Sequence, residues 1–201
     1  MEPRSAHLDA DRLRALAHPL RVQLLGALRI EGTATASQLA DRLGTSSGMT
    51  SYHLRQLADA GLIEEVVDKG NARERWWRAA HDTTSFRPSE VTGGWTEAAR
   101  WLQSEQGRVR EREWSTWLAE RDTWSDTWGD VADSSDYCFR LTADELESLL
   151  TVLHDVLRAE LARTVDRRDG REPVPPEAEA VRLHMLAFPT REVAGYRLDR
   201  P

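Results

Sequence analysis

The sequence of 201 residues predicts a mainly α-helical fold with small β elements, on three observations. Apolar residues recur at three- and four-residue spacing through the first third of the chain, which is the helical period. Two of the short helices indicated by this spacing are separated by a tight turn, and a β-prone hairpin follows them. After residue 95, a long helical pattern precedes a smaller region in which β-prone segments flank one further helix.

The first helical pattern runs over residues 9–30 and is divided near His18. Its apolar positions are Leu13, Leu16, Ala17, Leu20, Leu24, Leu25 and Leu28. Pro19 interrupts the pattern, but proline is well tolerated at the first position of a helix. The sequence therefore predicts two helices that meet at His18, the second running over 19–29 and ending before Gly32.

A third helix begins at Thr35. Thr35 as N-cap and Gln38 three residues later have the spacing of a capping box, and Gly44 closes the helix. Its apolar stripe consists of Leu39, Ala40 and Leu43.

A fourth helix starts only two or three residues after Gly44. Ser46 or Ser47 caps it, and Gly61 ends it. Two short helices joined by so tight a turn form a helix-turn-helix. The buried stripe of the fourth helix is expected to be Thr50, Leu54 and Leu57.

A β-hairpin follows the helix pair. Residues 62–67 and 73–79 are β-prone, and residues 69–72 form the turn between them. The helices and the hairpin together specify an N-terminal winged helix-turn-helix. We expect it to be followed by a long helix and a small α+β C-terminal region.

The segments of this N-terminal part resemble the DNA-binding domain of ArsR-type winged helix-turn-helix transcriptional regulators. The resemblance covers about a third of the chain and is carried by LRALAHPLRVQLLGAL, TASQLADRLGTSSGMTSYHLRQLADAGLI and RERWWRAA. It implies a DNA-binding regulator, with repression as the default sign. Metal-sensing members of the family carry a cysteine pair in the helix before the turn. This sequence has SQLADRL there, so no metal site of that kind is expected.

The predicted DNA-contacting residues lie on the fourth helix and on the hairpin. In a winged helix the second helix of the pair enters the major groove. With its apolar stripe buried, the outward face carries Ser47, Gly48, Ser51, Tyr52 and Arg55. The hairpin, or wing, adds Lys69, Asn71, Arg73 and Arg75. The alternative, that these are ordinary solvated residues, stays open, especially for the wing, because Asp68 and Glu74 are adjacent.

Charge divides the chain into two regions. Residues 1–80 carry 11 Lys+Arg and 10 Asp+Glu, a net charge of +1, whereas residues 81–201 carry 16 and 24, a net charge of -8. This asymmetry predicts different partners for the two regions. We expect a DNA-binding domain over 1–80, a linker over 81–94, and a dimerisation and effector region over 95–201.

The C-terminal region is expected to alternate helices and strands. A long helix covers 95–128, and a loop covers 129–135. Strands are predicted over 137–141 and 181–188, where apolar residues alternate. Between them, Thr142 and Glu145 form a capping box at the start of a helix. The apolar stripe of that helix is Leu146, Leu149, Leu150, Leu153, Leu157 and Leu161.

Tryptophan is concentrated in the long helix, since six of the eight tryptophans lie between Trp95 and Trp128. Such a stripe is more often core or dimer contact than ligand site. The alternative is a pocket for a flat aromatic or apolar effector. The candidate lining residues are Trp101, Trp114, Trp117, Trp124 and His184.

Other chemistry finds little support in the sequence. Cys138 lies between aromatic neighbours and is expected to be a buried, inert thiol. His53 is expected to pack rather than to bind metal. There is no glycine-rich phosphate loop, no G-x-S-x-G motif and no histidine pair at i and i+4, so no enzyme, cofactor or metal site is expected.

The prediction from the sequence is a homodimeric transcriptional regulator that binds a palindromic operator in double-stranded DNA. A cytoplasmic location is expected, because no run approaches the ~18 apolar residues of a membrane span and the N-terminus lacks a secretory signal. Two alternatives remain open. One is a ligand-independent DNA-binding protein, and the other is a winged helix used as a protein-interaction module.

Overall fold

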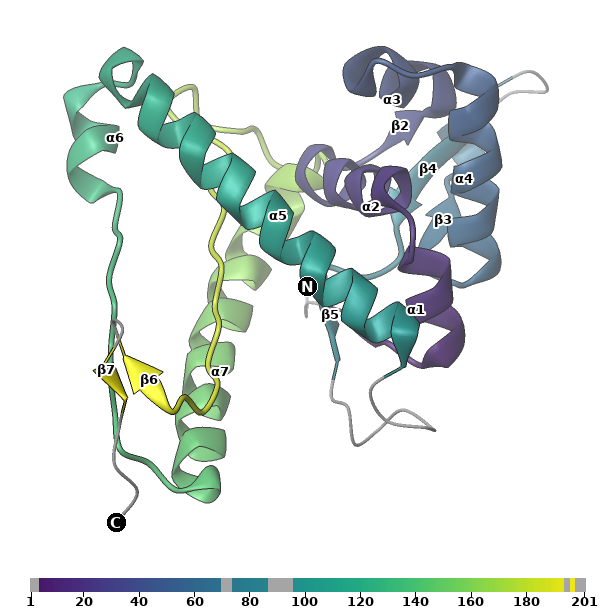
Figure 1. Ribbon diagram of the computed structural model, residues 1–201. Helices are drawn as coiled ribbons and strands as arrows, with labels where there is room; N and C mark the ends of the chain where they lie inside the picture. The colour runs from purple at the N-terminus through teal and green to yellow at the C-terminus, as the bar shows by residue number, and fades with distance from the viewer. Residues whose placement is uncertain (1–3, 70–73, 87–95, 194–195, 198–201) are drawn as a thin grey trace.

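The chain folds into an N-terminal helical unit with a small sheet and a C-terminal part built on two long helices (Figure 1). The computed structural model describes residues 4–69, 74–86, 96–193 and 196–197. Helix α5, Glu97–Glu120, lies against the N-terminal unit at its start and runs away from it. None of the helices in these ranges is both long and apolar enough to cross a membrane.

The first two helices meet at His18, as the position of Pro19 predicts. Helix α1 covers Ala10–Leu16, and α2 covers Pro19–Glu31 with His18 as its N-cap. The Nδ1 atom of His18 accepts a hydrogen bond of 3.2 Å from the backbone N–H of Leu20. This bond satisfies one of the free donors in the first turn of α2.

The helix-turn-helix is also confirmed. Helix α3 covers Ala36–Leu43, and the capping box between Thr35 and Gln38 is present. Gly44 follows in the left-handed conformation, with φ of 61°. Helix α4 covers Ser47–Asp59, and its N-cap is Ser46, one of the two serines expected.

A three-stranded antiparallel sheet with the order β2-β4-β3 completes this unit. Strands β3, Ile63–Glu65, and β4, Trp76–Ala79, form the expected hairpin but are shorter than predicted. A 3₁₀ turn over Val67–Lys69 ends the first arm, and residues 70–73 of the expected turn lie outside the described residues. Strand β2, Ala34–Thr35, was not predicted, because two residues are too few to show an alternating pattern.

The core of the molecule lies in the N-terminal unit. Its fully buried large side chains include Leu13, Leu24, Leu28, Leu39, Leu54, Leu57 and Leu62. Ala99 and Leu102 of α5 belong to the same cluster. The start of α5 is therefore fixed to the winged helix, and the expected division at residue 95 is not a division of the core.

The range 81–94, expected to be a linker, begins with a strand. Strand β5, Thr83–Ser85, pairs in parallel with β1, Ser5–His7. The sequence gives little signal for this pair, since both strands are short and polar. Residues 87–95 lie outside the described part of the chain.

The long tryptophan-rich helix ends earlier than predicted. After α5 come a 3₁₀ turn over Arg121–Thr123 and a short helix α6, Asp126–Val131. The hydroxyl of Thr123 donates to the carbonyl of Glu120 at 2.6 Å, and Ser125 adopts an extended N-cap conformation. Polar side chains that bond to nearby backbone compete with helix continuation, which explains the break. The predicted loop over 129–135 consequently begins inside α6.

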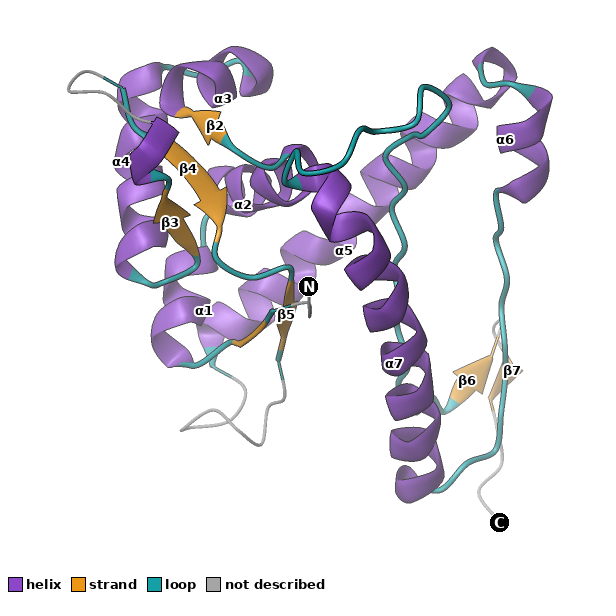
Figure 2. Ribbon diagram, turned by 180° about the vertical axis from the view of Figure 1, so that it is seen from behind, coloured by secondary structure: helices purple, strands orange, loops and turns teal. Residues whose placement is uncertain are grey.

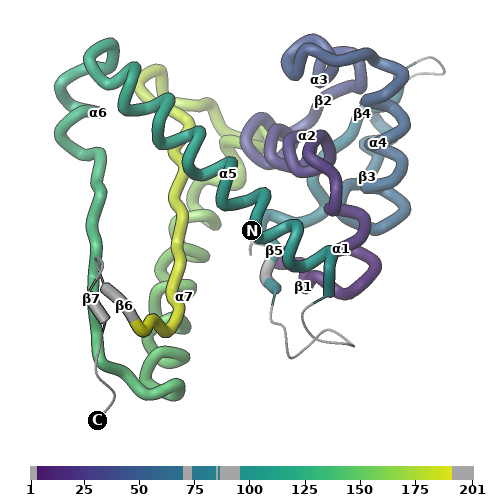
Figure 3. Tube along the Cα trace, viewed as in Figure 1, coloured from purple at the N-terminus to yellow at the C-terminus, as the bar shows by residue number. Residues whose placement is uncertain are grey.

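Helix α7, Ala143–Arg168, starts at the predicted capping box of Thr142 and Glu145. The two strands expected on either side of it were wrong. Residues 137–141 and 181–188 are extended but form no sheet, and the C-terminal hairpin is instead β6, Glu192–Val193, with β7, Tyr196–Arg197 (Figure 2). Figure 3 follows the two extended segments along the chain. In the described part of the chain neither segment pairs with another strand through backbone hydrogen bonds, so neither becomes a β-strand despite its alternating apolar residues.

The end of α7 docks on the N-terminal unit. The Nη1 atom of Arg168 lies 2.5 Å from Oδ1 of Asp82, which is buried, and the backbone N–H of Arg4 donates to Oδ2 of Asp82 at 2.7 Å. Burial alone would raise the pKa of Asp82, but these hydrogen bonds outweigh it and hold the pKa below its ordinary value. Gly32, with φ of 83°, lies directly beneath the carbonyl of Arg168. The end of α7 is therefore fixed to Asp82 and to Gly32, which directly follows α2.

Candidate nucleic-acid interface

Helix α4 presents the outward face that its sequence predicts. Thr50, Leu54 and Leu57 are all 0% exposed, and His53 is buried beside them. On the opposite side Ser47, Gly48, Tyr52 and Arg55 are exposed, and Ser51 is half-buried. The face is therefore polar, with one cation, and no acidic residue occurs on α4 before Asp59.

Part of this face lines a groove of about 470 Å³ between the helix pair and the wing. The lining residues are Thr35, Ala36, Ser37, Ser47, Gly48, Ser51, Arg55, Glu74, Arg75 and Trp77. The structure thus brings five of the predicted contact residues to one groove, and Tyr52 lies beside it. The contribution of the first turn of α3 was not predicted, because it depends on how the two helices cross.

The groove suits an anionic backbone. The first turns of both α3 and α4 line it, and the N-terminal end of a helix carries partial positive charge and free N–H groups. At Gly48 no atom lies within 4 Å of the position that a Cβ would occupy, so a phosphate can approach the backbone closely. The Nε of Arg55 donates to the carbonyl of Ser51 at 3.2 Å, which leaves its two terminal nitrogens for a ligand.

The wing is electrostatically mixed. The Nζ of Lys69 donates to Oγ1 of Thr33 at 3.1 Å and lies 5.7 Å from the ring centre of Trp76. Arg75 lies 3.8 Å from a carboxylate oxygen of Glu65. Asn71 and Arg73, the other two predicted wing contacts, lie outside the described residues. The two predicted wing cations that the structure describes, Lys69 and Arg75, are therefore partly engaged within the protein.

A histidine pair supports α4 from behind. The rings of His18 and His53 are 4.3 Å apart, and Nδ1 of His53 is buried without a hydrogen-bond partner. Burial is the largest cause that lowers the pKa of both histidines; the charge of Arg21 adds to it at His18, and those of His18 and then Arg21 add to it at His53. His53 therefore packs as expected, whereas its contact with His18 joins residues far apart in sequence and was not predicted. Within the described residues, no three His, Cys, Asp or Glu side chains gather as a metal site would require.

This pair makes stability depend on pH. Because the folded-state pKa of both histidines is lowered, their contribution to the free energy of unfolding is constant above the ordinary histidine pKa of about 6.5 and falls as the pH drops below it. Urea denaturation between about pH 8 and pH 5 measures the slope. His53→Phe keeps a ring in place and is expected to reduce the slope without abolishing it, because burial also lowers the pKa of His81. A matched control is His154→Gln, an exposed position on α7. Equal slopes for His53→Phe and the unmodified protein would contradict the assignment.

The five residues predicted to line an effector pocket occupy several environments. Trp101 packs against the N-terminal core, and the rings of Trp114 and Trp117 stack at 5.0 Å. His184 places Nε2 2.9 Å from Oε2 of Glu113 on α5. Trp124 lines a separate hollow of about 480 Å³ beside α6.

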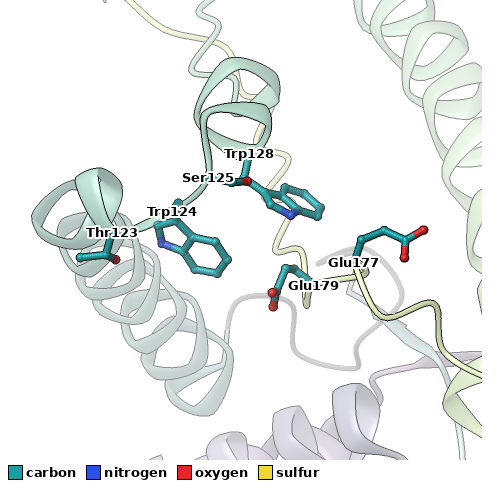
Figure 4. Close-up of a pocket in the computed structure, with 6 residues that line it drawn as sticks. All are labelled: Thr123, Trp124, Ser125, Trp128, Glu177 and Glu179. Carbon is teal, nitrogen blue, oxygen red and sulfur yellow. The ribbon is translucent and has the colours of Figure 1, made fainter.

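That hollow also contains residues that sequence reasoning missed. With Trp124 it is lined by Thr123, Ser125, Trp128, Glu177 and Glu179 (Figure 4). The glutamates come from the loop after α7, and no local signal in the sequence connects them to α6. Cys138, expected to be buried, is instead exposed, because the strand that was to bury it does not form.

Comparison with known proteins identifies one part of the chain. Residues 16–66 match the family described as Helix-turn-helix domain. The HTH-type transcriptional regulator YgaV of Escherichia coli (strain K12) is 36% identical over 64 residues, which are 32% of this chain and 65% of that protein. The chain therefore spans slightly less than two thirds of this relative.

Solved structures give weaker likenesses. A zinc-responsive MarR family member, ZitR of Lactococcus lactis, is 19% identical with a TM-score of 0.28, over 71% of this chain and 74% of that one. A mutant MarR from Escherichia coli, complexed with operator DNA, is 18% identical with a TM-score of 0.30, over 72% and 84%. Scores of this size do not establish a common overall fold.

Proposed function

We propose that this chain, whose residues 16–66 match the helix-turn-helix domain, is a DNA-binding transcriptional regulator that reads a palindromic operator as a homodimer. The observation that carries the proposal is the groove at which α3, α4 and the wing meet. It combines two helix N-termini, a glycine that admits a phosphate, and the exposed cation Arg55. Residues 47, 48, 51, 52 and 55 would read the major groove, and residues 69, 71, 73 and 75 of the wing would contact the backbone.

The surface area of the chain supports the homodimer. A compact monomer of 22.8 kDa exposes about 9,600 Å². This chain exposes 14296 Å², an excess of roughly 4,700 Å² over that value. Obligate dimers bury interfaces of about 2,000–5,000 Å² in total, so the excess is ample for a stable interface.

Most of the exposed large apolar side chains lie in the C-terminal half. Exposed large apolar residues there include Tyr137, Phe139, Leu141, Val152, Leu153, Val156, Val181, Leu183, Leu186 and Phe188. They occupy one side of α7 and the two extended segments that lack a paired strand. A second copy of the chain offers the same apolar helix face and the same two extended segments, which is the self-complementarity that a two-fold interface needs. Patches of this extent on a monomer are otherwise an aggregation hazard.

The proposed division of labour follows from these two surfaces. Residues 1–80 read DNA, residues 81–94 connect, and residues 95–201 supply the dimer contact and the regulatory input. Two recognition helices would sit about 34 Å apart on successive major grooves. We further propose that the protein represses transcription while it occupies the operator. A small-molecule effector that binds near the tryptophan-rich helix would release it from the DNA. Such a role requires the cytoplasmic location that the sequence led us to expect.

Substitutions on α4 test the reading surface. Arg55→Ala is expected to weaken binding to the preferred promoter fragment by about tenfold or more and to reduce the slope of log Kd against log salt by about one. Ser51→Ala is expected to weaken specific binding more than non-specific binding. Fluorescence anisotropy at several salt concentrations measures both effects.

The matched control is Arg112→Ala, which removes the same charge from an exposed position on α5. Its affinity is expected to stay within about twofold of the unmodified protein. A protein that prefers no promoter fragment over random DNA would contradict the proposal. It would favour a winged helix used for protein interaction.

A further inference from the structure

The hollow beside α6 has the chemistry of a site for an organic cation. Its six lining side chains are two indoles, two carboxylates and two hydroxyls, and none of them is positively charged. Figure 4 shows the indole rings of Trp124 and Trp128 extending into the space that the carboxylate of Glu179 also enters, while the carboxylate of Glu177 lies at the edge of this space and is directed away from the rings. Aromatic faces and carboxylates both attract cations, so the two kinds of lining group favour the same class of ligand.

The neighbouring turn already shows one such contact. The guanidinium carbon of Arg121 lies 5.8 Å from the ring centre of Trp117. An indole face attracts a cation through its quadrupole, and the attraction is stronger where the cation is partly removed from water. Trp124 is 37% exposed and Trp128 is half-buried, so a ligand between them loses part of its hydration.

The two carboxylates are available to a ligand. Glu177 and Glu179 are exposed, and within the described part of the chain neither forms an ion pair or a side-chain hydrogen bond. The region over 81–201 has a net charge of -8, which raises the local concentration of cations and repels anions. An anionic ligand would meet two carboxylates and no compensating cation among the lining residues.

The geometry points to an organic cation with an apolar, aromatic body as the ligand of this hollow. Its volume of about 480 Å³ lies within the range of small-molecule sites. That this cation is also the effector rests on the proposed function, whereas binding of the cation to the hollow does not. The loop that carries both glutamates starts at the end of α7, which is docked on Asp82 and Gly32. A ligand that joins α6 to this loop therefore acts on both long helices.

Titration calorimetry on the full chain tests the charge preference. The probe is tetraphenylphosphonium, and the matched probe is tetraphenylborate, which has nearly the same size and shape but the opposite charge. We expect the cation to bind at least about tenfold more tightly than the anion. Equal affinities, or tighter binding of the anion, would indicate non-specific adsorption to apolar surface and would overturn the inference.

Paired substitutions test the location. The double variant Glu177→Gln and Glu179→Gln keeps the shape of the loop and is expected to weaken tetraphenylphosphonium binding by about tenfold. Glu172→Gln removes a carboxylate from the same loop outside the lining residues, and is expected to change the affinity by less than about twofold. An unchanged affinity in the double variant would mean that the cation binds elsewhere, and the inference would be wrong.

Because these titrations contain no DNA, they test cation binding independently of the proposed DNA-binding function. A further measurement compares operator affinity with and without saturating tetraphenylphosphonium. A change of about fivefold or more supports the role of the cation as effector. An unchanged operator affinity overturns that role, and the titration result stands. If the chain binds no DNA, the proposed function fails while the cation site is still judged by its own titrations.

Discussion

Replacement of Gly32 by alanine is expected to lower the free energy of unfolding by about 3 kcal/mol or more. Gly32 has φ of 83° and ψ of -114°, a conformation that residues with a Cβ rarely adopt. A Cβ at this position would lie 2.5 Å from the carbonyl oxygen of Arg168, and this neighbour is backbone, which cannot rotate away. The alanine therefore strains its own backbone and pushes the end of α7 off the N-terminal unit. Urea denaturation followed by circular dichroism measures the loss.

Gly44→Ala is the matched control. Gly44 is also left-handed, with φ of 61°, but no atom lies within 4 Å of the position of its Cβ. Its substitution is expected to cost only about 1 kcal/mol, the price of the backbone conformation alone. Hydrogen exchange in the last turn of α7 should accelerate in Gly32→Ala and stay unchanged in Gly44→Ala. Equal losses of stability and equal exchange in the two variants would show that α7 does not dock at Gly32.

The double variant Leu153→Asp and Val156→Asp is expected to be monomeric and to bind the operator at least about a hundredfold more weakly. Both side chains are exposed on α7 of the single chain, so two aspartates there leave the fold of the protomer intact. In the proposed dimer they would place charges in an apolar interface, where an unpaired charge is costly. Two half-sites then bind independently, and the gain from linking them disappears. Sedimentation velocity and fluorescence anisotropy give the two readouts.

The control for this variant is Thr151→Asp and His154→Asp. It adds two aspartates at exposed positions of the same helix, on the side away from Val152 and Val156. It is expected to remain dimeric and to bind the operator normally. If both double variants were dimeric, the apolar face of α7 would not be the interface.

Helix boundaries could be predicted from the sequence because their signals are local. The capping boxes at Thr35 and Thr142 and the start of α2 at Pro19 each depend on side chains within one helical turn. The outward face of α4 followed from its apolar stripe for the same reason. Signals of this kind survive without knowledge of tertiary contacts, which is why the winged helix was predictable nearly throughout.

Strands and the α6 hollow could not be predicted in the same way. Alternating apolar residues at 137–141 indicate that one side of a strand is suited to burial, but a strand exists only when another strand pairs with it. The pairing of β1 with β5 and the approach of Glu177 to Trp128 join positions distant in sequence. The exposure of Cys138 follows from the missing partner strand. In each case the sequence does not indicate which distant segments come into contact.

The anchoring of α5 in the N-terminal core has a mechanical consequence. Ala99 and Leu102 fix one end of a helix of 24 residues, which is about 36 Å long. If a partner holds the far end of α5, a tilt of α5 by roughly 10° displaces the winged helix by about 6 Å, which is close to the rise of one α-helical turn. A small change in packing around α6, at the far end of α5, would thus produce a larger movement at the end that carries the winged helix. In the proposed homodimer, a small rearrangement around α6 would therefore change the separation of the two recognition helices relative to the pitch of DNA.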